Sequence, residues 1–199
     1  MVAQMKELGL FGATISREYG GLALPASTYA KIVTTISEVW MSLSGIFNSH
    51  LIMCAAVERF GTPEQKQEYL PRFAKGEIRG GLALTEPGCG TDLQAIRTHA
   101  VRDGDNYVIN GTKTWISNGI EGSCFALLVK TDLHAEPRHQ GMSLFLAEKG
   151  DGFSVSKKLK KLGYKGIDSA ELVFDDYVVP ASRLIGGEEG LGFKHTVGG

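Results

Sequence analysis

The chain of 199 residues has few cysteines, almost no net charge and no long hydrophobic run. Cys54, Cys89 and Cys124 are isolated and odd in number, without metal-ligand spacing, which is typical of a reducing compartment and predicts a cytoplasmic protein. The net charge of −1 argues against a general nucleic-acid binder. The longest aliphatic run, near residues 124–129, is too short for a membrane span, so none is expected.

The sequence also lacks the pattern of a signal peptide and a clear metal-binding motif. Lys6 and Glu7 interrupt the segment in which a signal peptide would need a continuous apolar region. His134 and His139 lie in the polar stretch 131–141, but no carboxylate or cysteine has ligand spacing beside them. A solvated loop is therefore expected there, with a metal-binding pair as the alternative, and no metal site is predicted.

The first 78 residues have helical spacing and helical punctuation. Apolar residues recur at helical intervals over 26–39 and 44–60. Gly61 is expected to end the second of these helices. Thr62 and Gln65 then predict a capping box for the next helix, with a proline at its first position.

From residue 79 the pattern changes to short β-type runs that continue to Pro180. Two alternating segments joined by residues 103–106, Asp-Gly-Asp-Asn, predict a hairpin. Strands at this spacing, without intervening helices, indicate an antiparallel sheet or barrel. The stretch 186–199 is typical of the approach to another helix.

These patterns predict an α+β protein in which a helical domain precedes a β domain. We expect the helical domain to occupy residues 1–78 and the β domain residues 79–185. Residues 186–199 would begin a C-terminal helical bundle that is otherwise missing from the chain.

The first candidate site is the sequence GGLALTEPGCGTD at residues 80–92. Its glycines let a ligand's phosphates approach the backbone N–H groups, and Thr85 and Thr91 add hydroxyls. It is neither a Walker loop nor a dinucleotide fingerprint. The alternative is a well-formed turn, in which Glu86 belongs to the bend and Asp92 caps the next element.

The second candidate site is NGTKTWISNG at residues 110–119, on a predicted strand. Trp115 offers a flat apolar face, and the period of two places Ser117 on the same side. An aromatic face beside a hydroxyl suits a planar heterocycle with polar edges. The alternative is a core tryptophan. Together the two motifs predict phosphates at the glycine turn and a ring system beside the tryptophan.

Three sequences together, LALTEPGCGTD, GTKTWISNG and KKLGYKGIDSAELVFDDYVVP, resemble the acyl-CoA dehydrogenase family. The resemblance covers essentially the whole chain. The usual family pattern is Thr-Glu-Pro-x-Ala-Gly-Ser-Asp, whereas this chain has Cys89 for the alanine and Thr91 for the serine. Both replacements are small, and threonine keeps the hydroxyl. The resemblance implies FAD-dependent α,β-dehydrogenation of an acyl-CoA thioester, with an electron-transferring flavoprotein as the usual acceptor.

The same resemblance implies where FAD and acyl-CoA would bind. The first motif would follow the flavin's pyrimidine side and then its pyrophosphate, and the tryptophan motif would flank the isoalloxazine, with the Ser117 hydroxyl near flavin N5. The implied cofactor-binding residues are Leu82, Ala83, Leu84, Thr85, Gly90, Thr91, Trp115, Ile116 and Ser117. Thr91 would also contact the acyl-CoA. Ser156 and Lys157, which match substrate-contacting positions in some relatives, would join it, unless the basic run 156–165 is simply a solvated surface.

The family's proton-abstracting glutamate comes from the C-terminal helical domain. The resemblance therefore implies no catalytic residue within residues 1–199, and the base glutamate is expected beyond Gly199. We expect the chain alone to be inactive and to hold FAD weakly. A homodimer or homotetramer is expected for a full-length protein. Glu86 and Asp92 are not assigned to catalysis, and His50 is expected to be a core histidine.

Two other functions remain open at this point. Acyl-CoA oxidases and class D flavin monooxygenases have the same architecture but react with oxygen. A non-catalytic binding or assembly module of the same fold is the third possibility. The yellow colour of bound flavin would exclude that module.

Overall fold

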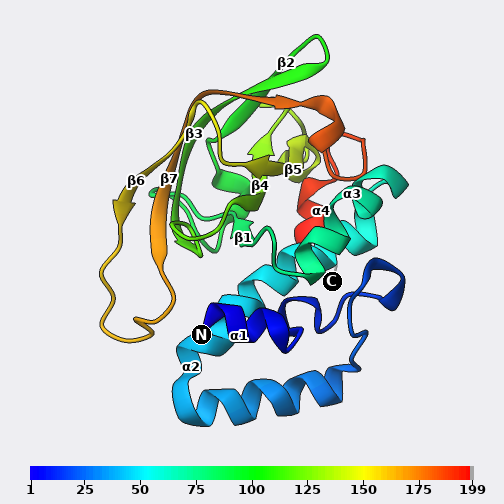
Figure 1. The fold of residues 1–199 in the computed structure, drawn as a ribbon. Helices are drawn as coiled ribbons and strands as arrows, with labels where there is room; N and C mark the ends of the chain where they lie inside the picture. The colour runs from blue at the N-terminus through cyan, green and yellow to red at the C-terminus, as the bar shows by residue number, and fades with distance from the viewer. Residues whose placement is uncertain (198–199) are drawn as a thin grey trace.

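A computed structural model describes residues 1–197, and Figure 1 shows helices packed below a curled β-sheet. Three helices come first: α1 (Val2–Glu7), α2 (Ala26–Phe60) and α3 (Pro63–Ala74). The strands are β1 (Gly80–Ala83), β2 (His99–Asp103), β3 (Asn106–Ser117), β4 (Cys124–Lys130), β5 (Met142–Glu148), β6 (Phe153–Lys158) and β7 (Ser169–Pro180). Helix α4 (Gly192–Val197) follows. The predicted order of a helical domain and then a β domain is confirmed, whereas the exact domain boundaries stay predictions.

The helix expected within residues 186–199 corresponds to α4, which begins at Gly192. The last two positions of that stretch, Gly198 and Gly199, lie outside the described residues. A helix is therefore present as far as Val197, and the expectation that residues 186–199 open a C-terminal helical bundle stays a prediction.

Helix α2 is bent at Trp40, where φ is −158° and ψ is 95°. This break separates the two helical segments expected from the sequence. The first half carries the half-buried stripe Tyr29, Ile32, Val33 and Ile36, which packs against the core. The second half is largely buried. The bend therefore lets one continuous element contribute two different faces to the protein interior.

Helix α2 also corrects the expectation that no segment is long and apolar enough to cross a membrane. It is the one helix within residues 1–197 that meets this test by length and composition. However, 56% of its most apolar window is buried inside the molecule. Core helices commonly pass the same test, so most of this hydrophobicity is accounted for by packing.

Helix α3 begins with the predicted capping box. The Gln65 N–H donates to Thr62 Oγ1 at 3.3 Å, and the Thr62 N–H donates to Gln65 Oε1 at 3.0 Å. The Gln65 amide also donates to the carbonyls of Ser182 and Leu184, both at 2.7 Å. One residue therefore caps the helix and ties it to the segment after β7.

The sheet has the strand order β1-β4-β2-β3-β7-β6, with β5 also paired to β4. The predicted hairpin is confirmed, because β2 and β3 pair antiparallel up to Asp103 opposite Asn106. The purely antiparallel expectation is wrong for two pairings: β2 runs parallel to β4 where His99 lies opposite Lys130, and β1 runs parallel to β4, with Gly80 opposite Cys124. The hairpin lies between these strands in the sequence and serves as the long crossover that a parallel pair requires.

Strand β4 is buried on both faces and separates two apolar clusters. Cys124, Ala126 and Leu128 face the cluster shared with the helices. Phe125, Leu127 and Val129 face the cluster inside the curl of the sheet. This double burial explains why β4 reads as a continuous hydrophobic run rather than an alternating one.

Candidate functional site

The two sequence motifs lie side by side in opposite directions. The Thr114 N–H donates to the Thr85 carbonyl at 2.8 Å. Four residues earlier in the first motif, a Cβ placed on Gly81 would lie 3.3 Å from the Ser117 carbonyl. The end of β1 and its following turn are therefore held against the end of β3, as the sequence predicted.

Asn118 fixes this junction to the helical layer. Its side-chain amide donates to the Gly80 carbonyl at 2.9 Å and to the Ile46 carbonyl at 3.0 Å. Its own backbone is left-handed, with φ of 60°, a conformation that asparagine tolerates better than most residues. One buried side chain thereby joins β1, β3 and the second half of α2.

Trp115 is displayed outward by an irregularity in β3. The β3–β7 register shifts between Lys113 and Ile116, and Trp115 lies within this shift with φ of 60°. Its side chain is 56% exposed. Bulges of this kind redirect side chains near functional sites, and a bulky residue with left-handed φ carries strain that the surrounding structure must compensate. The indole is therefore presented to solvent rather than packed as a core tryptophan.

The remaining predicted cofactor residues differ in exposure. Gly90 and Thr91 are exposed, and Leu82, Leu84, Thr85 and Ser117 are half-buried. Ala83 and Ile116 are buried inside the curl of the sheet. These two side chains face the core, so only their backbone atoms are available to a ligand on the outer surface.

Neither backbone conformation nor packing within the protein requires glycine at the two glycine positions of the turn. Neither Gly88 nor Gly90 has a positive φ. A Cβ at Gly88 would meet nothing within 4 Å, and one at Gly90 would meet only Thr85 Cγ2 at 3.8 Å. Because packing would accept a side chain at both positions, the open backbone is free to receive a group from outside, and the turn fits a phosphate-bearing cofactor.

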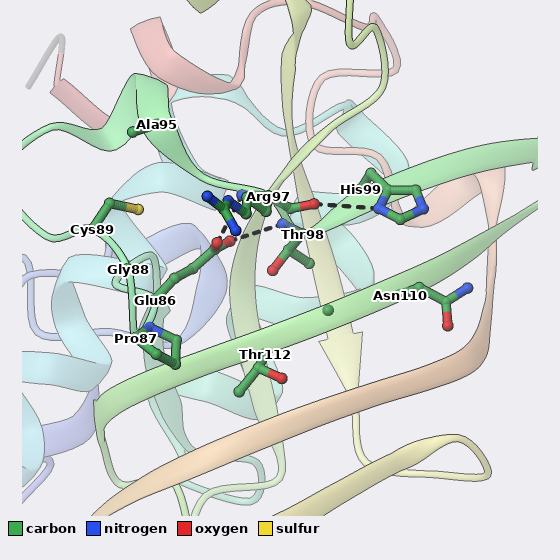
Figure 2. Close-up of a pocket in the computed structure, with 11 residues that line it drawn as sticks. Glu86, Pro87, Gly88, Cys89, Ala95, Arg97, Thr98, His99, Asn110 and Thr112 are labelled. Atoms are coloured by element: carbon green, nitrogen blue, oxygen red, sulfur yellow. Dashed lines mark hydrogen bonds between the residues drawn. The ribbon is translucent and has the colours of Figure 1, made fainter.

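Beneath the turn, Glu86 and Lys113 form a buried ion pair. The Lys113 Nζ lies 2.8 Å from Glu86 Oε1 and donates to the Leu84 carbonyl at 2.9 Å. The same carboxylate accepts the N–H groups of Arg97 at 2.7 Å and Thr98 at 3.0 Å. Figure 2 shows the Glu86 carboxylate directed toward Arg97 and Thr98, and these three residues are among those that line a cavity of about 420 Å³. Glu86 is therefore an anchor between the two motifs, rather than a simple residue of the bend.

This environment also determines the charge of Glu86. Burial raises the pKa of its carboxyl, but the Lys113 ammonium and the hydrogen bonds to the carboxylate outweigh burial, so the net pKa lies below the usual value. A carboxylate held ionised by three donors is a poor proton acceptor, which supports leaving Glu86 out of catalysis. Asp92 is exposed and makes no side-chain capping bond, so its predicted cap is wrong.

Other predicted residues lie away from this junction. Ser156 and Lys157 are exposed on β6, where the Ser156 hydroxyl donates to Glu171 at 2.8 Å. His50 is a core histidine as expected: it is buried with Nε2 3.1 Å from the Phe73 carbonyl, and burial lowers its pKa to about 4. Within residues 1–197 no cluster of three or more side chains could hold a metal ion.

The position of the expected catalytic base has no counterpart in the structure. The glutamate is expected beyond Gly199, and Gly199 itself lies outside the described residues, which end at Val197. The base therefore stays a prediction.

Sequence reasoning missed Lys113 and Asn118. Both lie inside the tryptophan motif, yet lysine and asparagine are normally read as surface and turn residues. One sequence feature could have identified them. Both residues lie beside the buried residues of the predicted strand, within the motif that was already a candidate site.

Comparison with known proteins matches both halves of the chain to one family. Residues 1–77 match the acyl-CoA dehydrogenase N-terminal domain, and residues 81–177 match the acyl-CoA dehydrogenase middle domain. The short-chain specific acyl-CoA dehydrogenase of Clostridium acetobutylicum is 42% identical over 194 residues, covering 96% of this chain and 50% of that protein. The chain thus spans about half the length of the curated relatives it matches.

Solved structures give the same result. A chain in the structure titled electron transferring flavoprotein of Acidaminococcus fermentans has a TM-score of 0.92 and 38% identity, covering 98% of this chain and 51% of that one. The acyl-CoA dehydrogenase from Bacillus anthracis, complexed with FAD, has a TM-score of 0.88 and 35% identity, covering 98% and 33%. Both domain matches and these relatives show that the chain belongs to the acyl-CoA dehydrogenase family.

Proposed function

We propose that this chain forms the FAD-binding front part of an enzyme that oxidises an acyl-CoA thioester at its α and β carbons. The observation that carries the proposal is the apposition of residues 80–85 with residues 114–118. This junction has an outward indole at one end and an open glycine turn beside it. Membership of the family and the FAD complex of the Bacillus anthracis relative support the same cofactor.

The roles of the residues follow from their exposure. The N–H groups around Gly90 and the Thr91 hydroxyl would hold the pyrophosphate, and Thr91 would also contact the acyl-CoA. Trp115 would cover the ring system, and Ser117 would orient its edge. When bound, FAD supplies the hydride acceptor for the substrate's β-hydrogen. Leu82, Leu84 and Thr85 would line the ring through half-buried side chains, and Ala83 and Ile116 through backbone atoms.

The proton acceptor and the partners belong to the same proposal. On the strength of the family resemblance, we propose that the α-proton is taken by a carboxylate beyond Gly199, and the three donors to Glu86 support leaving that residue out of this role. The chain alone would then not turn over acyl-CoA. An electron-transferring flavoprotein is the proposed acceptor, and a homodimer or homotetramer the proposed assembly of a full-length protein. The cytoplasmic location stays a prediction.

The FAD site is tested by Gly90→Ala. A titration of the purified chain with FAD, followed by flavin fluorescence, should show saturable binding that the variant weakens about tenfold, because the new methyl obstructs the phosphates. Its urea unfolding midpoint should stay unchanged, since that methyl meets only Thr85 at 3.8 Å. Gly150→Ala is the matched control, because a Cβ there meets nothing within 4 Å and the position lies outside both motifs. Equal FAD affinity in both variants, or no binding by the parent chain, would contradict the proposed site.

Trp115 gives a second test that separates function from stability. Trp115→Gly should raise the free energy of unfolding by about 1 kcal/mol, because glycine adopts positive φ without strain. The same change should weaken FAD binding about tenfold through loss of ring stacking. Trp115→Phe keeps a ring and should retain most of the affinity. A glycine variant that is clearly less stable than the parent would show that the indole serves packing instead.

A further inference from the structure

Two adjacent backbone N–H groups beside the proposed flavin site have no partner within the protein. Leu84 and Thr85 follow β1 directly, and neither donates its N–H to any residue in 1–197. Both residues are half-buried. Backbone donors in a protein interior are almost always paired, so two free N–H groups at this depth leave a place for an acceptor from outside the chain.

The carbonyl groups of the same two residues are both occupied from β3. The Leu84 carbonyl accepts the Lys113 ammonium at 2.9 Å. The Thr85 carbonyl accepts the Thr114 N–H at 2.8 Å. The segment is therefore fixed through its acceptors, while its donors remain available.

The peptide bond between Leu84 and Thr85 connects Lys113 to one of these free donors. This bond is trans, since the one cis peptide bond described within residues 1–197 precedes Pro137. In a trans peptide the C=O and N–H groups point in opposite directions. Because the Leu84 carbonyl points toward the Lys113 ammonium, the Thr85 N–H points away from it.

We propose that Lys113 is a positioning residue for FAD, which aims the Thr85 N–H at the pyrimidine edge of the flavin and strengthens it as a donor. An ammonium at the carbonyl end of a peptide polarises the amide, and hydrogen bonds in such a chain reinforce one another. Reduction adds negative charge to this edge of a flavin, where hydrogen bonds and nearby charge tune the cofactor. A stronger donor therefore favours the reduced form. The inference rests on the proposed function and adds a residue that sets the relative affinity for the two oxidation states.

The surroundings of Lys113 allow its charge to act on the peptide. Its side chain is fully buried, and that of Glu86, 2.8 Å away, is 6% exposed. The Glu86 carboxylate is itself held by the N–H groups of Arg97 and Thr98. This paired carboxylate keeps the ammonium charged and in one position, and salt screens buried charges only weakly. The ion pair thus presents its positive end to the Leu84 carbonyl.

The test compares two variants that each lose one positive and one negative charge. The first carries Lys113→Met with Glu86→Gln, which removes the ammonium without leaving an unpaired carboxylate. The matched control carries Arg183→Met with Glu148→Gln, which removes an ion pair with a separation of 2.6 Å. Glu148 belongs to β5, which pairs with β4 on the side away from β1. Urea unfolding of both variants shows that they are folded under the conditions of the binding measurements.

Equilibrium dialysis without oxygen gives the dissociation constants of oxidised and of reduced FAD for each protein. The measurements are made at mildly alkaline pH, where reduced flavin is an anion. We expect the first variant to lose about tenfold more affinity for reduced than for oxidised FAD, equivalent to about 30 mV for a two-electron couple. The control should keep the parent's ratio within about twofold. Equal losses for the two oxidation states would show that Lys113 is purely structural and would overturn the proposal.

A second measurement uses the parent chain alone and does not depend on the stability of a variant. Amide hydrogen exchange, followed by nuclear magnetic resonance, should be fast at the Thr85 N–H in the free chain. Saturating FAD should slow it at least about tenfold. The Thr114 N–H, which is already bonded, is the internal control and should be protected in both states.

The exchange result separates this inference from the proposed function. A Thr85 N–H that is protected without FAD, or that stays unprotected when FAD is bound, would overturn the proposed hydrogen bond and leave the FAD site standing. Absence of saturable FAD binding by the parent chain would instead contradict the proposed function, and the role of Lys113 would fall with it.

Discussion

Lys113→Met is expected to lower the free energy of unfolding by about 3–5 kcal/mol, the largest stability effect predicted for this chain. The substitution keeps the volume of the side chain but removes the cation 2.8 Å from Glu86. An ionised carboxylate would remain, almost fully buried, with only the N–H groups of Arg97 and Thr98 as donors. Urea unfolding followed by circular dichroism measures the change.

The pH dependence of this loss identifies its cause. In the parent chain the pKa of Glu86 is depressed, so its stabilisation is present above the unfolded pKa of about 4.3 and is lost as the pH falls through the folded value. Without Lys113, burial would raise that pKa, and protonation at pH 4 would relieve the unpaired charge. The gap between variant and parent should therefore be smaller at pH 4 than at pH 7.

The double variant Lys113→Met with Glu86→Gln is the control for this interpretation. It removes both charges, keeps an amide that can accept from the Arg97 and Thr98 N–H groups, and should be more stable than Lys113→Met alone. If the double variant loses more stability than the single variant, and the loss does not change with pH, the effect comes from packing and the unpaired-charge explanation is wrong.

Asn118→Ala is expected to cost about 3 kcal/mol, because two effects combine at this position. The amide groups that reach the Gly80 and Ile46 carbonyls are lost from a buried site. In addition, alanine at φ of 60° is less favourable than asparagine. Amide hydrogen exchange should locate the damage in β1 and in the second half of α2, the two elements that the side chain connects.

Asn118→Gly separates the two contributions. Glycine accepts the left-handed backbone and removes only the hydrogen bonds, so its loss should be smaller than that of alanine by about 1 kcal/mol. Equal losses in both variants would show that the backbone conformation contributes nothing. A loss below about 1 kcal/mol in each would show that water replaces the amide and that the junction does not depend on Asn118.

Features set by neighbouring residues were predictable from the sequence. The capping box at Thr62 and Gln65 and the turn between β2 and β3 depend on residues a few positions apart, and both were confirmed. The two helical segments of α2 were also predicted, because their apolar periodicity stops near Trp40. The spacing of neighbouring residues is sufficient to predict these elements, because tertiary packing does not alter them.

Features that depend on distant partners were not predictable in the same way. The four residues of β1 do not encode whether β4 will pair with them in the same or the opposite direction. Lys113 was missed because a lysine is assumed to be exposed unless its carboxylate partner, 27 positions earlier in the chain, is known. The alternation of a regular strand was used to place Ser117 on the same side as Trp115, whereas the structure has a register shift between Lys113 and Ile116 that alternation does not describe.

The parallel pairing of β1 with β4 has a consequence for how the chain acquires its structure. During synthesis β1 leaves the ribosome about forty residues before the strand beside which it must lie, and the β2–β3 ribbon is made in between. Non-local pairings form slowly because a long loop must close first. Strand β1 therefore stays unpaired until β4 has been synthesised. During this interval its unpaired apolar segment makes the nascent protein prone to aggregation and to binding by chaperones.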